Sequence, residues 1–244
     1  MTANAVGNVL GILRLLRSGD YGNPIVQHVS DWCGGPIDPI KVAKVAGYVL
    51  ENVEAAEGQI NLSQLTVEAK QGLLQTTGSL KSAFLFSHMN NSLQSFFPAL
   101  DTSVTSFAIL ASAWGFSDFP IAADEIASLV SDIQATCATL DDVDIHPLVR
   151  ETAKRHISVL LALLSNAQAL GVDAAMAAYF ELLVHLRRAD QSIPEDQQQG
   201  TKPLWDKVKE WGARITTISE IANKGGSLLT QAEKLVPLLQ SFMR

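Results

Sequence analysis

Apolar residues recur every three or four positions along most of this chain, and that spacing is typical of amphipathic α-helices. Alternating apolar and polar runs joined by Asn-Gly turns, the usual sign of β-hairpins, are absent from the sequence. We therefore expect an all-α fold, built as a multi-helix bundle. The clearest apolar stripes comprise Val149, Ala153, His156, Leu160, Leu164 and Ala167; Val172, Ala175, Tyr179, Leu182 and Leu186; and Leu204, Val208, Trp211, Ile215, Ile218 and Ala222.

Glycine and proline indicate where these helices begin and end. The segment SGDYGNP at 18–24 predicts the end of the first helix. A second helix is expected to open near Asp38 and to end at Gly58. Pro147 has the position of a proline in the first turn of a helix, and Gly171 that of a C-terminal glycine.

One polar segment divides the chain. Residues 189–203 (ADQSIPEDQQQGTKP) are rich in glutamine and carry no apolar stripe, so we interpret them as a linker. The bundle would then occupy 1–188, and a tethered C-terminal helical hairpin would occupy 204–244. The stripes of this hairpin must pack on the bundle or on another chain.

Charge is unevenly distributed. Residues 118–147 hold seven acids and no Lys or Arg, whereas the remaining 18 acids balance the 18 bases, so the net charge of −7 lies in this stretch. Such a field disfavours nucleic acid and anionic membrane surfaces as partners. We predict a docking face for a basic protein partner, or for a second copy of the chain, supplemented by hydrophobic anchors on the hairpin. The predicted contact residues are Asp118, Asp124, Glu125, Asp132, Asp141, Asp142 and Asp144, with Leu204, Trp205 and Trp211.

The segment 82–117 next to this stretch carries a single formal charge, Asp101. One interpretation is a central helical hairpin that is buried on all sides by amphipathic helices. The alternative is a membrane hairpin that is held in the bundle and released on a trigger, aided by the N-terminal helix 5–17. The membrane-contacting residues would be Phe96, Phe97, Phe107, Ile109, Leu110, Trp114 and Phe116.

Other sequence features bear on the compartment. No window of eighteen residues is apolar throughout, and the first apolar stretch is followed rather than preceded by Arg14 and Arg17. A constitutive membrane span or a secretory signal is therefore not expected. Cys33 and Cys137 are too few for a disulfide scaffold and are interpreted as free thiols. Together these features predict a cytoplasmic protein.

Catalytic and metal-binding signatures are sparse. Arg150 and His156, in RETAKRH, resemble the Arg–His motif of all-helical ribonucleases of the HEPN type, and the resemblance covers only this motif. On a helix, six residues of separation place the two side chains roughly 120° apart, which instead favours His156 as a hydrogen-bonded core residue. The cluster DDVDIH at 141–146 lacks the glycine and spacing of a calcium loop, and no phosphate-binding glycine loop is present. We expect no metal and no cofactor.

A broader resemblance rests on the order of segments. An apolar segment ending in Gly115 and Phe116, preceded by LLQTTGSLK and followed by a charged helix, resembles a layout of uncharacterised bacterial all-helical proteins over about residues 65–190. The resemblance implies a toxin, immunity or phage-defence component and no catalytic residue. The function predicted from the sequence is therefore non-enzymatic contact with another protein, with membrane action and HEPN-like ribonuclease activity as alternatives.

Overall fold

The computed structural model describes residues 4–114, 123–194 and 198–223. Across these residues the chain forms eleven α-helices and one short 3-10 turn, without a β-strand. The prediction of an all-α, multi-helix fold is confirmed.

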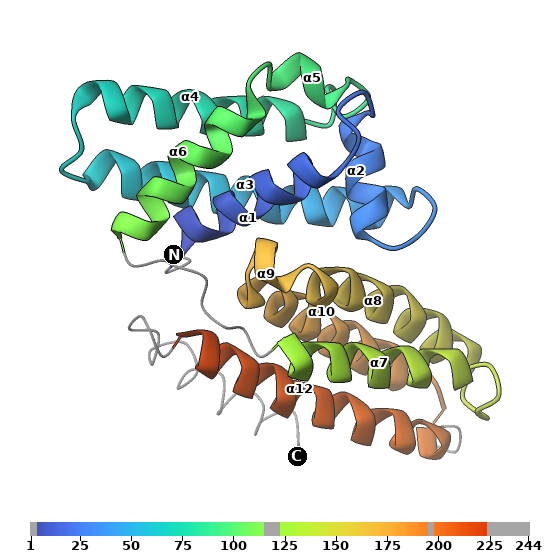
Figure 1. Cartoon of the computed structure of the whole chain (residues 1–244). Helices are drawn as coiled ribbons and strands as arrows, with labels where there is room; N and C mark the ends of the chain where they lie inside the picture. Colours follow the sequence, from blue (N-terminus) through green and yellow to red (C-terminus); the bar gives the residue numbers. More distant parts are fainter. Residues whose placement is uncertain (1–3, 115–122, 195–197, 224–244) are drawn as a thin grey trace.

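The helices form two layers that share one hydrophobic core (Figure 1). The upper layer consists of α1 (Ala5–Ser18), α2 (Ile25–Trp32), α3 (Pro39–Leu62), α4 (Val67–Phe84), α5 (Leu93–Phe96) and α6 (Leu100–Ala113). The lower layer consists of α7 (Ala123–Thr139), α8 (Pro147–Ser165), α9 (Ala167–Leu170), α10 (Val172–Gln191), the 3-10 turn η1 (Gln199–Thr201) and α12 (Lys202–Asn223).

Helix α1 joins the two layers, because it packs on α3 and α6 in the upper layer and on α9 in the lower one. It can approach α9 closely because Gly11 has no side chain: a Cβ there would lie 2.6 Å from Ala169 Cα. One turn away, the buried Asn8 donates from Nδ2 to Asn52 Oδ1 on α3 at 2.7 Å. Asn52 in turn donates to the carbonyl of Leu170 at 3.3 Å, so a buried amide pair links α1, α3 and α9.

Several helix boundaries follow the sequence prediction. Asp38 caps α3 by accepting from the backbone N–H groups of Ile40 and Lys41, and Pro147 lies in the first turn of α8. The predicted stop at Gly58 is wrong, since α3 continues to Leu62. A helical glycine costs only about 1 kcal/mol relative to alanine, so the packed face of α3 outweighs it.

The prediction that segment 82–117 is buried on all sides is also wrong for its described part, 82–114. Helix α6 lies at the outside of the upper layer and buries only one stripe, which includes Phe107 and Leu110. Its outer face carries Ser and Thr, and Ile109 on that face is 66% exposed. A lack of charge therefore marks a surface covered by hydroxyl groups here, rather than a fully buried helix.

No helix in the described ranges combines the length and the apolar character needed to cross a bilayer.

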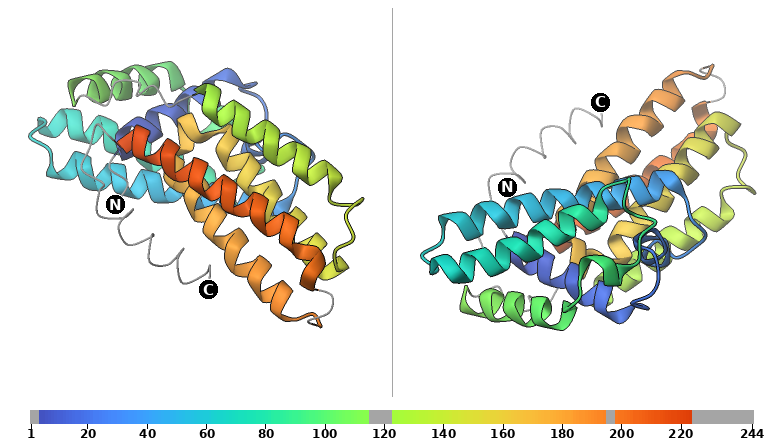
Figure 2. Two further views of the ribbon diagram at one scale, coloured as in Figure 1. Left: turned by 90° about the horizontal axis from the view of Figure 1, so that it is seen from below. Right: turned by 90° about the horizontal axis from the view of Figure 1, so that it is seen from above.

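The linker is shorter than predicted, and the first helix of the predicted hairpin packs within the bundle. Helix α10 continues to Gln191 and α12 begins at Lys202, so less of the chain separates them than the predicted 189–203. Helix α12 packs on α7 and α10 as part of the bundle, and Figure 2 shows it alongside α10 in the view from below. The second helix predicted for the hairpin, within 224–244, lies outside the described residues.

The contact between α1 and α9 can be tested with paired glycine substitutions. We expect Gly11→Ala to lower the free energy of unfolding by about 1–3 kcal/mol, because the new methyl group meets the backbone of Ala169 and forces the helices apart. Gly58→Ala is the matched control, since a Cβ there meets nothing within 4 Å. It should raise stability by about 0.5–1 kcal/mol through helix propensity. Urea unfolding followed by circular dichroism measures both, and a stabilising Gly11→Ala would contradict the close approach.

Candidate functional site

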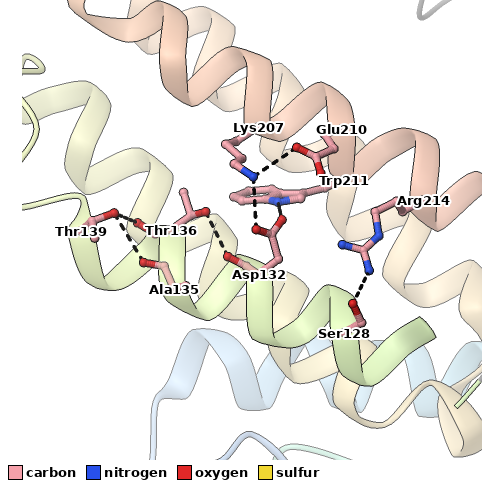
Figure 3. Close-up of polar contacts among 9 residues, drawn as sticks. All are labelled: Ser128, Asp132, Ala135, Thr136, Thr139, Lys207, Glu210, Trp211 and Arg214. Carbon is pink, nitrogen blue, oxygen red and sulfur yellow. Dashed lines mark hydrogen bonds and ion pairs between the residues drawn. The ribbon is translucent and has the colours of Figure 1, made fainter. Parts of the chain in front are cut away.

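The acidic stretch and the C-terminal helix meet in a polar seam between α7 and α12 (Figure 3). Asp132 on α7 accepts from Trp211 Nε1 at 2.8 Å and from Lys207 Nζ at 3.2 Å. Burial by itself would raise the pKa of Asp132, but the hydrogen bonds from Trp211 and Lys207 outweigh it and hold the pKa below its ordinary value. Asp132 is therefore an ionised anchor for α12.

Further acids of the stretch also bind cations of the same chain. Arg214 on α12 donates from Nε to Glu125 Oε1 at 2.8 Å and from Nη2 to Ser128 Oγ at 2.9 Å. At the other end of α7, Asp141 accepts from Lys154 Nζ on α8 at 2.6 Å. We call Glu125, Ser128, Asp132, Lys207, Trp211 and Arg214 the α7–α12 seam.

The seam changes the interpretation of the predicted docking face. Glu125, Asp132 and Asp141 each form an ion pair with a base of α8 or α12. Asp132 and Glu125 are half-buried in the seam, whereas Asp141 stays exposed beside Lys154, and partner contact stays a prediction for it. Asp124, Asp142 and Asp144 are exposed, and partner contact stays a prediction for them. Asp118 lies outside the described residues.

The predicted hydrophobic anchors require a correction. Leu204 and Trp211 are buried in the core of their own chain, so they offer no surface to a partner in this arrangement. Trp205 is half-buried and donates from Nε1 to Asp190 Oδ2 at 3.3 Å. The physical reason is that the apolar stripe of α12 finds α7 and α10 within reach, and burial there removes it from water.

The two residues of the ribonuclease-like motif lie on α8 but are not brought together. Arg150 donates from Nη2 to the carbonyls of Val143 and Ile145, which fixes the loop before α8. His156 stacks on His185 of α10, with 4.4 Å between ring centroids. Among the residues that the structure places, no group of three or more His, Cys, Asp or Glu side chains could hold a metal ion.

A hollow on the surface lies between α1 and α6, and we call it the α1–α6 groove. Its volume is about 610 Å³. Small side chains on α6, such as Ala108 and Ser112, leave the space, and the exposed Ile109 stands beside them. The lining residues are Arg14, Arg17, Val104, Thr105, Ala108, Ile109, Ser112 and Ala113.

The rim of the α1–α6 groove is basic on the α1 side. Arg14 and Arg17 are both exposed, and Arg17 forms an ion pair with Asp101 at 3.7 Å. Both members of that pair are open to solvent, so it contributes little and leaves the guanidinium group accessible to a stronger acceptor. The groove therefore combines an apolar centre with cationic groups on one side.

Ile109 was predicted as a membrane contact, whereas Arg14 and Arg17 were not predicted as site residues. The available signal was their spacing of three on an otherwise apolar helix, which puts both on its one polar face. The other candidate contacts are divided: Phe97, Phe107 and Leu110 are buried, Phe96 and Trp114 are half-buried, and Phe116 lies outside the described residues.

Comparison of the chain with models of protein families, with curated proteins and with solved structures found no match.

The α7–α12 seam predicts a graded response to substitution. Asp132→Ala should lower the free energy of unfolding by about 1–3 kcal/mol, because the buried Trp211 Nε1 loses its acceptor and Lys207 loses its partner. Asp132→Asn keeps an oxygen for Trp211 and should cost less. Asp142→Ala, on an exposed side chain, should change stability by less than about 0.5 kcal/mol. Equal urea midpoints for Asp132→Ala and Asp142→Ala would show that the seam does not hold α12.

Proposed function

We propose that this protein acts without catalysis, by binding a partner protein at the α1–α6 groove, and that the partner contributes an acidic amphipathic helix. The observation that carries the proposal is the position of Ile109, a large apolar side chain that is 66% exposed within a groove bordered by Arg14 and Arg17. A surface hollow that combines an apolar lining with a few charged groups is typical of binding sites.

The shape and the charge of the groove favour a helix. A helix laid along α6 would cover Ile109 and the neighbouring Ala108 with apolar residues spaced three and four apart. Covering the exposed part of Ile109 contributes about 1–2 kcal/mol. Carboxylates one turn apart on the flank of such a helix can bind Arg14 and Arg17 in the fork geometry that guanidinium groups favour.

The acidic net charge of the chain does not oppose this partner. Charges separated by more than about 8–10 Å are largely screened at physiological salt, so a single helix senses mainly the local charges. These are Arg14, Arg17 and the Asp101 carboxylate that pairs with Arg17, which leaves a local excess of positive charge. An anionic membrane is an extended plane of charge, so the net charge of −7 opposes its approach more than that of a single helix. The same groove therefore favours an acidic helix over an anionic bilayer.

Three helical peptides that share one apolar face and carry acidic, neutral or basic flanks test the proposal by fluorescence anisotropy. The acidic peptide should bind about tenfold more tightly than the basic one, since two arginine contacts contribute about 0.5–1 kcal/mol each. Ile109→Asp should weaken this binding at least about tenfold, because it removes the apolar contact and adds a carboxylate that repels the acidic peptide. Ile37→Asp, at an isoleucine that is 52% exposed outside the groove, should leave it unchanged.

Two results would overturn the proposal. One is the absence of binding by all three peptides, or equal binding to the wild type and Ile109→Asp. The other is tight binding to phosphatidylserine vesicles that Ile109→Asp removes, which would assign the groove to a membrane surface. The bacterial toxin, immunity or defence setting stays a prediction.

A further inference from the structure

Two histidines that are distant in the sequence meet on neighbouring helices. His156 on α8 and His185 on α10 stack with 4.4 Å between ring centroids and 12° between ring planes. The two residues lie at nearly equal distances before and after Gly171, where the chain reverses between α9 and α10. His156 is half-buried and His185 is exposed, so the pair lies at the edge of the contact between α8 and α10.

The surroundings of this pair are rich in positive charge. Lys44 on α3 forms an ion pair with Glu181, one turn before His185 on α10. Arg155 precedes His156 on α8. The charged groups that act on the pair are therefore Lys44 from α3 and Arg155 from α8, while the acid on α10, Glu181, is already bound by Lys44.

We propose that the stacked His156 and His185, together with the Lys44–Glu181 ion pair, form a pH-sensitive joint that loosens the packing of α3 against α8, and the ion pair of α3 with α10, when the pH falls. The joint links the two layers of the fold, since α3 belongs to the upper layer and α8 and α10 to the lower one. This inference does not depend on the α1–α6 groove.

The direction of the effect follows from the protonation of the pair. Burial is the main reason that the pKa of His156 falls from 6.5 to about 4, and the neighbouring His185, Lys44 and Arg155 add to the effect. The folded protein therefore binds this proton less readily than an opened form does. The contribution of neutral His156 to the stability of the folded state is therefore fully present above pH 6.5. It is lost as the pH falls toward 4.

A proton on His156 adds a cation beside His185 and Lys44. The opened form relieves this repulsion, because there the imidazoles separate and are hydrated. The Lys44–Glu181 ion pair then loses the neighbouring helix packing that holds it in place.

The pH window separates this joint from Asp132 and Asp141. Hydrogen bonds hold the pKa of Asp132 and that of Asp141 below the ordinary value of 3.8, so both carboxylates stay ionised and keep their partners at pH 5.5. Burial also lowers the pKa of His28, but this residue lies on α2, and its effect should appear there.

Amide hydrogen exchange measured at pH 7.5 and pH 5.5, and corrected for intrinsic rates, tests the joint on the full chain. We expect exchange to rise by up to about tenfold at pH 5.5 in α3 around Lys44 and in the adjoining turns of α8 and α10. His156→Phe keeps an aromatic ring that cannot be protonated and should remove this response. His88→Phe, at a histidine of the upper layer, should retain it.

A second variant and a second measurement cover the case in which His156→Phe does not fold. Lys44→Gln leaves both imidazoles and removes a neighbouring cation, so the acid response should shrink. In the wild type, the ring resonance of His156 should titrate well below 6.5. A midpoint at 6.5, an unchanged response in His156→Phe, or faster exchange spread evenly over α6 and α12 would overturn the proposal.

Discussion

The fold depends on the close crossing of α1 over α9. Gly11 lets the two backbones approach until any larger residue would meet Ala169. Beside this contact, the buried Asn8 donates to Asn52, and Asn52 donates to the carbonyl of Leu170. Buried polar groups are tolerated only when they are hydrogen-bonded, so this pair also fixes the register of α1 relative to α3 and α9.

The α1–α6 groove is a consequence of that crossing. Once the apolar face of α1 is held between α3, α6 and α9, its one polar face must lie beside α6. Arg14 and Arg17 are on that face, and the small residues of α6 leave room next to them. An amide pair at the centre of the molecule thus determines where two cations and an exposed Ile109 meet at its surface.

Much of the fold could be predicted from the sequence because its determinants are local. Apolar residues spaced three and four apart specify a helix whatever that helix packs against. Asp38 caps α3 by accepting hydrogen bonds from backbone N–H groups only two and three residues further along. Gly58 failed as a stop because packing along the rest of α3 outweighs one weak residue. The prediction that α6 is buried was wrong because it relied on the absence of charge, and the Ser and Thr side chains of α6 face water without carrying a charge.

The candidate sites were harder to predict, since they depend on pairs that are distant in the chain. Charge counting found the acid excess at 118–147 but not its partners, because Lys207 and Arg214 lie on a helix whose docking place the sequence leaves open. His156 was placed on an apolar stripe, but its stacking on His185 depends on how α10 returns along α8.

The seam also explains why acids of the acidic stretch lie opposite bases of α12. An apolar stripe can bury α12 against α7 and α10 in several registers, since apolar contacts are non-directional. Asp132 accepts one hydrogen bond from Trp211 and one from Lys207, and both are satisfied together in one register. Glu125 adds a second fixed point through its ion pair with Arg214, about two helical turns along α7 from Asp132. Two acids of the acidic stretch, Asp132 and Glu125, therefore align α12 within the bundle. The positive charge at the α1–α6 groove comes from α1.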